Sequence, residues 1–295
     1  MEKKVLAKPL KKVSTLDWRP AGAIGNVVFF HGYRSRMGMI LPFLDTLANA
    51  GFNVFACDLP NHGTSVEVER ERGSIKSFCD LLDTARAMVL TVLVSSSRRR
   101  MPTFIIGHSL GALITVRLLQ SRPRIKRHVQ GVVCVSMPFS VDHNVTKTVK
   151  RFRWLLNPLA PFLRRLFPNL PVDKPAFASD GRSIIEEDVR AMRDDLYYKG
   201  PLRLSTALEI RGGVDKAREE IGKLDIPLLF VHGEHDEVAP LGALEEIYPH
   251  IPSSEKELMR CHVMGHDILN ESNEAVAHIV YWLKERLMGT PRRVL

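Results

Sequence analysis

The sequence predicts an α/β fold with a doubly wound, mainly parallel sheet and one inserted segment. Short apolar runs rich in Val, Ile and Phe alternate along the chain with segments of helical spacing. One interval between two such runs is far longer than the roughly dozen residues that a parallel crossover needs. The 295 residues, 45% of them hydrophobic and 25% charged, can bury a large core. We therefore expect a globular chain built on one core domain.

Six apolar runs are typical of buried strands, because they are short and bounded by turn-forming or polar residues. They cover residues 26–32, 52–58, 103–109, 129–136, 226–233 and 257–265. Apolar residues with helical periodicity lie between them, at 38–50, 76–95, 110–120, 238–248 and 272–288. This order favours parallel strands joined by crossover helices.

The long interval lies between the fourth and fifth of these strands, at 137–225. It contains several prolines, which indicates short, kinked helices. We expect residues 1–136 and 226–295 to form the core, and 137–225 to form a helical cap and its return to the core.

The sequence GHSLG, residues 107–111, joins a predicted strand to a predicted helix. In that context a GxSxG pattern predicts a nucleophile elbow, with Ser109 on a strained turn. Gly107 and Gly111 would let the strand and the helix pass closely. The helix that begins there points its positive end at the reacting centre. The alternative is a loop serine between two glycines without a chemical role.

A serine hydroxyl needs a histidine base and a carboxylate that orients it, and behind such an elbow the acid and then the histidine follow in chain order. After the fifth strand we expect Asp236 to be the acid, because it lies in the turn before a helix; Glu234 is the alternative. After the sixth strand we expect His266 to be the base, because it lies in the loop beyond the strand. His262 is the alternative, and is expected to be a packed strand residue.

The oxyanion of an acyl-transfer reaction needs preorganised donors. We expect one from the backbone N–H of Leu110, directly after the serine. The second is expected from the backbone N–H of Tyr33, in the loop after the first predicted strand, where Gly32 permits a tight turn. The Tyr33 side chain could instead line the pocket. His31 is expected to brace this loop.

Metal and cofactor sites are not indicated. His232, His235, His262 and His266 lie near two strand ends but lack a compact ligand spacing such as HExxH. The four cysteines are scattered without a CxxC pair, as in a reduced, cytoplasmic protein. No apolar run is long enough for a membrane span or a secretion signal.

The net charge of +9 leaves several partner classes open. The basic N-terminus and Arg98 to Arg100 are interpreted as solvated surface, because no aromatic stacking platform or nucleic-acid-binding signature accompanies them. No nucleic-acid partner is expected.

Six segments together resemble the α/β-hydrolase superfamily, and more narrowly the monoacylglycerol lipase and lysophospholipase-like serine hydrolases. They are FFHGYRS (29–35), DLPNHGTS (58–65), GHSLGA (107–112), LYYKGPLRLSTALEI (196–210), VHGEHDEVAP (231–240) and GHDILNE (265–271). The resemblance spans about residues 20 to 288. The chain departs from the lipases at Leu110 and at Gly111-Ala112, where they usually carry Met and Gly-Gly, and it has Pro60-Asn61 in a turn that commonly holds a less constrained pair.

This resemblance implies an α/β-hydrolase fold and a serine esterase without a cofactor, most simply one that cleaves monoacylglycerol through a Ser109 acyl-enzyme. A lysophospholipase and a small carboxylesterase for phenolic or other soluble esters are the alternatives. A hydrolase-like ligand receptor without turnover is the alternative from a different class, and a lipid or small ester is the expected ligand in each case.

Residues 150–171 interleave large apolar with basic side chains. Trp154, Leu155, Phe162 and Phe167 are candidates for a lid or an acyl pocket. Such a composition favours a helix pair at a membrane interface, which would bring the cap into peripheral contact with an anionic membrane. The equally weighted alternative is an ordinary cap helix whose apolar face packs on the core.

Overall fold

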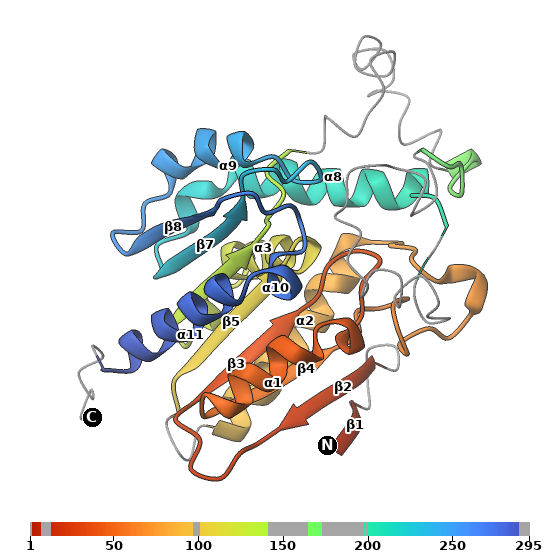
Figure 1. Ribbon diagram of the computed structural model, residues 1–295. Helices are drawn as coiled ribbons and strands as arrows, with labels where there is room; N and C mark the ends of the chain where they lie inside the picture. Colours follow the sequence, from red (N-terminus) through yellow and green to blue (C-terminus); the bar gives the residue numbers. More distant parts are fainter. Residues whose placement is uncertain are drawn as a thin grey trace.

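The computed structural model describes residues 2–6, 13–96, 101–140, 165–172, 198 and 200–288. Within these residues eight strands form one sheet in the order β1-β2-β4-β3-β5-β6-β7-β8 (Figure 1). In chain order the strands are β1 (Glu2–Leu6), β2 (Val13–Trp18), β3 (Gly25–Phe30), β4 (Phe52–Cys57), β5 (Thr103–His108), β6 (Gly131–Val135), β7 (Leu228–Gly233) and β8 (Lys256–Cys261). The neighbouring strands β4, β3, β5, β6, β7 and β8 pair in parallel, whereas β2 pairs antiparallel with both β1 and β4. The predicted mainly parallel α/β fold is confirmed.

Helices cover both faces of this sheet. They are α1 (Leu41–Asn49), α2 (Phe78–Ser96), α3 (Leu110–Ser121), α4 (Pro123–Lys126), α8 (Leu204–Glu219), α9 (Leu241–Ile247), α10 (Ile268–Glu271) and α11 (Asn273–Met288). Short 3-10 turns lie at η1 (Met37–Met39), η2 (Glu69–Glu71), η5 (Ile221–Lys223) and η6 (Tyr248–His250). The α1, α10 and α11 helices pack on one face, and α2, α3, α8 and α9 on the other.

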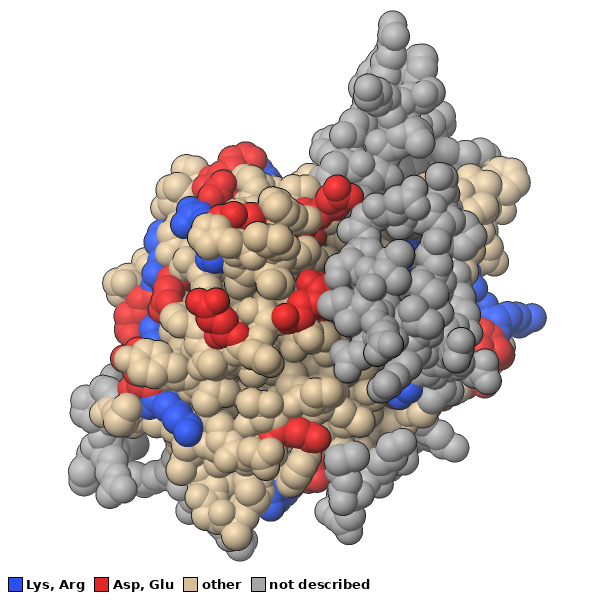
Figure 2. All heavy atoms as spheres, in the orientation of Figure 1, with Lys and Arg blue, Asp and Glu red and all other residues tan. Residues whose placement is uncertain are grey.

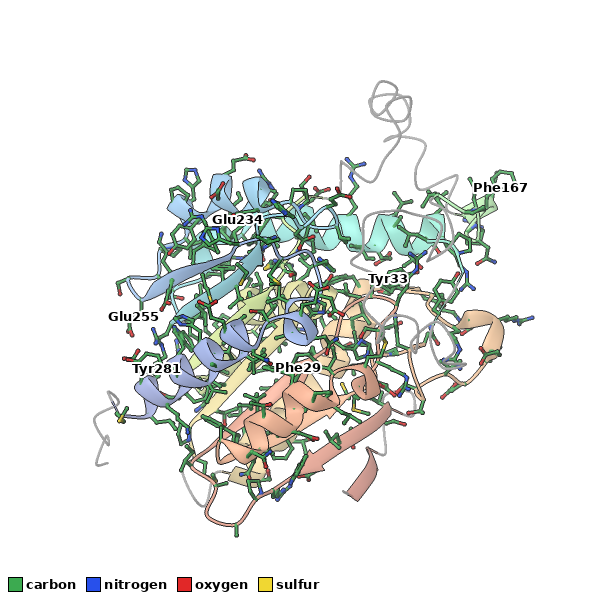
Figure 3. The ribbon with its side chains drawn as sticks, viewed as in Figure 1. Phe29, Tyr33, Phe167, Glu234, Glu255 and Tyr281 are labelled. Atoms are coloured by element: carbon green, nitrogen blue, oxygen red, sulfur yellow. The ribbon has the colours of Figure 1, made fainter. Side chains whose placement is uncertain are left out.

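Every residue of β3, β4, β5, β6 and β7 is buried. A parallel sheet covered on both faces leaves no polar side, so its strands are continuous apolar runs rather than alternating ones. On the face of α1 and α11, Phe29 (labelled in Figure 3) meets Phe43 edge-on, with ring centroids 5.8 Å apart. The strong apolar signal of these strands follows from this packing.

Residues near the N-terminus form two strands that the sequence pattern did not predict. The β2 strand pairs with β4 and buries Val13 and Leu16, and β1 extends the sheet by one further antiparallel strand. A strand that buries only part of its length, as β2 does, carries a weaker apolar pattern than the central strands. That weakness explains why the sequence pattern missed it.

The last strand is shorter than predicted. β8 ends at Cys261, whereas the expected strand continued to residue 265. His262 therefore lies beyond the strand, and its side chain is 81% exposed, so the expectation of a packed strand residue is wrong. The residues after Cys261 form the loop that carries His266.

Charged side chains are dispersed over the described surface that Figure 2 shows. Asp and Glu form several separate groups there, with Lys and Arg between and beside them. No helix in the described ranges has both the length and the hydropathy to cross a membrane. All four cysteines are free thiols, and Cys57, Cys134 and Cys261 are buried.

Candidate active site

Ser109 is the residue between β5 and α3, and its backbone has φ 52° and ψ −117°. A non-glycine residue reaches this region at a cost in free energy, which the surrounding packing must offset. A Cβ atom at Gly107 would overlap the backbone of the first turn of α3. A Cβ atom at Gly111 would overlap the carbonyl oxygen of Phe30 in β3. Both glycines thus allow the close approach that the elbow pattern implies.

Three side chains from distant loops form one hydrogen-bond chain. The Nε2 atom of His266 lies 2.9 Å from the Oγ atom of Ser109. On the other side of the ring, Nδ1 lies 2.8 Å from Oδ2 of Asp236. Since an ionised carboxylate only accepts, Nδ1 carries the proton and Nε2 is free to accept from the serine hydroxyl.

The acid is enclosed, whereas the histidine is partly open. The side chain of Asp236 is fully buried and that of His266 is 14% exposed. The second carboxylate oxygen of Asp236 accepts from the backbone N–H groups of Val238 and Ala239, at 2.9 and 2.7 Å. Burial opposes ionisation, but the hydrogen bond from His266, followed by the N–H of Ala239, holds the pKa of Asp236 below its usual value. The carboxylate is therefore ionised at neutral pH.

The two alternative residues pair with each other instead. Nδ1 of His262 lies 2.8 Å from Oε2 of Glu234. Glu234, labelled in Figure 3, directly follows β7, and its partner His262 is exposed. The loops after β7 and β8 thus contain two Asp/Glu–His pairs, and the side chain of Ser109 bonds His266 of the first pair.

The loop after β3 passes directly over the serine. A Cβ atom at Gly32 would lie 3.2 Å from Cβ of Ser109. The Gly32 carbonyl oxygen accepts from Nδ1 of His31 at 2.8 Å and from the N–H of Ser35 at 3.3 Å. Because a trans peptide points its C=O and N–H in opposite directions, the Tyr33 N–H is turned away from His31. His31 braces the loop, as expected.

The protonation of His31 follows from its partners. Its Nε2 atom accepts from the N–H of Leu59 at 2.9 Å, so the proton must be on Nδ1, which donates to Gly32. Burial lowers the pKa of His31, which keeps the ring neutral. A neutral ring can accept and donate at the same time, so both bonds can form together.

The structure also describes the N–H group of Leu110 and the side-chain ring of Tyr33. Leu110 is the first residue of α3, so its N–H has no partner within the helix. The ring of Tyr33 packs edge-on against those of His62 and Tyr198, with centroids 5.7 and 6.4 Å away. The ring thus has two aromatic neighbours.

Three supporting residues were not identified from the sequence. The carbonyl oxygen of His266 accepts from Nε2 of His108 at 3.0 Å and from Oγ of Ser136 at 2.9 Å. His232 donates from Nε2 to the carbonyl oxygen of Ala239, in the turn that holds Asp236. His108 precedes the serine and Ser136 follows β6, so only their positions at strand ends could have suggested them.

The lid candidates Trp154, Leu155 and Phe162 lie outside the described residues. Phe167 is described and is 54% exposed. Figure 3 shows it at the edge of the molecule, away from the strands. The side chains of three of the four histidines considered as metal ligands have other partners: His232 bonds Ala239, His262 bonds Glu234 and His266 bonds Ser109 and Asp236.

A family model described as "Serine aminopeptidase, S33" matches residues 22–273. The chain belongs to this family. The S33 match covers all the elements that carry the hydrogen-bond chain, and the resemblance to α/β-hydrolases is thereby confirmed.

Known lipases and esterases resemble this chain along most of its length. It is 22% identical to the monoglyceride lipase of Rattus norvegicus over 94% of this chain and 88% of the relative. It is 26% identical to the caffeoylshikimate esterase of Arabidopsis thaliana, over 89% of this chain and 78% of the relative. A structure of a soluble variant of the Saccharomyces cerevisiae monoglyceride lipase, 17% identical, superimposes with a TM-score of 0.80 over 97% of this chain and 94% of that one. The protein is a serine hydrolase of the lipase and esterase kind.

Proposed function

We propose that the protein hydrolyses monoacylglycerol to a fatty acid and glycerol, with Ser109 as nucleophile, His266 as base and Asp236 as acid. The observation that carries this proposal is the continuous hydrogen-bond chain from Ser109 Oγ through His266 to Asp236, with distances of 2.9 and 2.8 Å. Such a chain makes an otherwise weak hydroxyl nucleophilic at neutral pH.

In the acylation step the Oγ atom of Ser109 attacks the ester carbonyl carbon while Nε2 of His266 takes its proton. The carbonyl oxygen becomes an oxyanion, which accepts hydrogen bonds from the N–H groups of Tyr33 and Leu110. Collapse of this intermediate breaks the bond to the glycerol oxygen. The proton on His266 passes to that oxygen, so glycerol leaves neutral and the acyl group stays on Ser109.

In the deacylation step a water molecule replaces glycerol. His266 takes a proton from the water, whose oxygen attacks the acyl carbon through a second oxyanion. The proton then returns to Ser109 and the fatty acid is released. Asp236 stabilises the imidazolium in both steps and keeps the ring in one tautomer.

The substrate class is supported by the relatives named monoglyceride lipase, which match more than nine-tenths of this chain. A small soluble carboxylic ester is the second candidate, favoured by the similarity to the caffeoylshikimate esterase. A lysophospholipase activity, and a ligand receptor that binds without turnover, are alternatives that one assay series separates.

The test compares a long-chain monoacylglycerol, a lysophosphatidylcholine of the same chain length, a phenolic ester and a short p-nitrophenyl ester. We expect the highest kcat/KM for the monoacylglycerol and covalent labelling of Ser109 by a fluorophosphonate probe. Ser109→Ala should lower kcat on the order of 10⁶-fold. Ser121→Ala, at the other end of α3, is the matched control and should retain full activity.

The outcomes are distinct. A preference for the phenolic ester would make the protein a soluble-ester esterase, and a preference for the lysolipid would make it a lysophospholipase. Binding of these lipids without turnover or labelling would indicate a receptor.

We also propose that 137–225 is an insertion on the core and that its basic and apolar part contacts an anionic membrane. Arg165 is exposed, and the neighbouring Leu166 and Phe167 are 52% and 54% exposed. Each basic residue near such a surface contributes about 1 kcal/mol. Arg164→Glu with Arg165→Glu should therefore reduce sedimentation with anionic vesicles, as should added salt, while short-ester hydrolysis persists. Equal sedimentation of variant and wild type would contradict membrane contact.

A further inference from the structure

Arg34 directly follows the residue whose N–H we propose as an oxyanion donor. The arginine is only 7% exposed, and its Nη2 atom donates to the carbonyl oxygen of Gly200 at 2.7 Å. Its guanidinium carbon lies 5.4 Å from the ring centroid of Tyr33 and 5.9 Å from that of Tyr198. One buried cation thus contacts both Tyr33, in the loop after β3, and a segment more than 160 residues away in sequence.

The backbone of Arg34 is in a strained conformation. Its φ is 62°, in the left-handed region where glycine is favoured and a larger residue is strained. The turn itself could be made more easily by glycine. The hydrogen bond to Gly200 and the contacts with two tyrosine rings can offset this strain.

Tyr198 is itself held by several contacts with other parts of the protein. The hydroxyl of Tyr198 donates to the carbonyl oxygen of Pro201 at 2.8 Å. The guanidinium of Arg203 lies 5.1 Å from the same ring and donates to the carbonyl oxygen of Arg70 at 3.0 Å. The ring also packs against Gly73 so closely that a Cβ atom there would overlap it.

We propose that Arg34 is a positioning residue, which holds the Tyr33 N–H in the oxyanion hole by tying its loop to Tyr198 and Gly200. The inference rests on the proposed function. Two donors hold the Gly32 carbonyl and so orient the Tyr33 N–H from one side. The side chain of Arg34 holds the loop at the residue that follows Tyr33. Its loss would let the Tyr33 amide move while Ser109, His266 and Asp236 stay in place.

Arg34→Gly tests this idea because glycine tolerates the left-handed backbone and removes the whole arginine side chain, the guanidinium included. Loss of an oxyanion donor lowers kcat by about 10²- to 10³-fold, so a displaced donor should lower it by about 10- to 100-fold. We expect KM for a short ester to change less than about twofold, because the substrate makes this contact mainly in the transition state. Arg34→Lys, which keeps the cation without the planar fork, should be intermediate. Arg122→Gly, which removes an exposed arginine, is the control and should match wild type.

A second readout separates positioning from simple packing. A trifluoromethyl ketone forms a tetrahedral oxyanion adduct with an active serine, whereas a long-chain alcohol binds without one. For Arg34→Gly we expect inhibition by the ketone to weaken by the same factor as kcat/KM, with binding of the alcohol unchanged. Equal weakening of both ligands, or a kcat equal to wild type, would overturn the proposal.

Tyr198→Ala provides an independent route to the same contact. It should lower kcat in the same direction, and combining it with Arg34→Gly should cause little further loss because both act through one contact. Additive losses would contradict this, and if Arg34→Gly does not fold, Arg34→Lys and Tyr198→Ala still decide. Absence of Ser109-dependent hydrolysis in the wild type would overturn both proposals, whereas full activity of Arg34→Gly in an active enzyme overturns this one alone.

Discussion

The ring of His108 donates a hydrogen bond from Nε2 to the backbone carbonyl oxygen of His266, at 3.0 Å. The residue before the proposed nucleophile therefore anchors the main chain of the proposed base, whose own side chain bonds that nucleophile. Burial, followed by the neighbouring His266, lowers the pKa of His108 and keeps its ring neutral. Ser136 donates to the same oxygen at 2.9 Å, so two strand ends hold one loop.

His108→Leu should lower kcat for a short ester about tenfold, because His266 loses one of two anchors and small displacements of a catalytic group are costly. Its effect on stability should be only about 1 kcal/mol, since Ser136 still satisfies the carbonyl. Steady-state kinetics and urea unfolding measure the two effects. An unchanged kcat would show that Ser136 anchors the loop alone.

Single substitutions in the two Asp/Glu–His pairs should show which pair acts in catalysis. Asp236→Asn should reduce kcat on the order of 10⁴-fold, because the amide no longer fixes the imidazole tautomer. His266→Ala should reduce it on the order of 10⁶-fold. Glu234→Gln and His262→Ala are the matched controls, and each should stay within about twofold of wild type. The opposite ranking would make the exposed pair the functional one.

The stability of the fold should decrease in mild acid because of His62. Burial is the main cause that lowers the pKa of His62 to about 3 from its ordinary 6.5. Below pH 6.5 the unfolded chain takes up a proton that the folded chain refuses, so the stabilisation present above pH 6.5 is lost as the pH falls toward 3. Between pH 7 and pH 5 this group should account for about 2 kcal/mol of the loss.

Urea unfolding at both pH values measures this loss. His62→Gln should show a pH dependence smaller by about that amount, whereas His128→Gln, at an exposed histidine, should follow wild type. Equal pH dependence in all three proteins would mean that His62 is not held neutral.

Two glycine substitutions should act in opposite directions. Gly111→Ala would place a Cβ atom against the Phe30 carbonyl, so we expect a loss of about 1 to 3 kcal/mol in stability and a severe loss of activity. Gly212 lies within α8, and a Cβ atom there meets nothing within 4 Å. Gly212→Ala should therefore stabilise the protein by about 0.4 to 1 kcal/mol with activity unchanged. Thermal unfolding and ester hydrolysis of both variants check the pair.

Much of the fold could be predicted because its signals are local. The buried strands β3 to β7 are continuous apolar runs, and a parallel sheet covered on both faces requires such runs. The GHSLG turn likewise needs glycines at fixed spacing, because helix α3 passes close to β3 and β5. Steric demands of this kind act within a few residues and leave a direct trace in the sequence.

The tertiary structure decided what depends on which loops meet. The carboxyl ends of parallel strands converge at one edge of the sheet, so Asp236 reaches His266 and Glu234 reaches His262 across 30 and 28 residues of chain. Residues two positions apart, such as Glu234 and Asp236, have nearly the same local sequence context. The bonds from His108 to His266 and from Arg34 to Gly200 join still more distant residues. They form because the packed sheet brings these residues within hydrogen-bond distance, a property of the whole fold rather than of any segment.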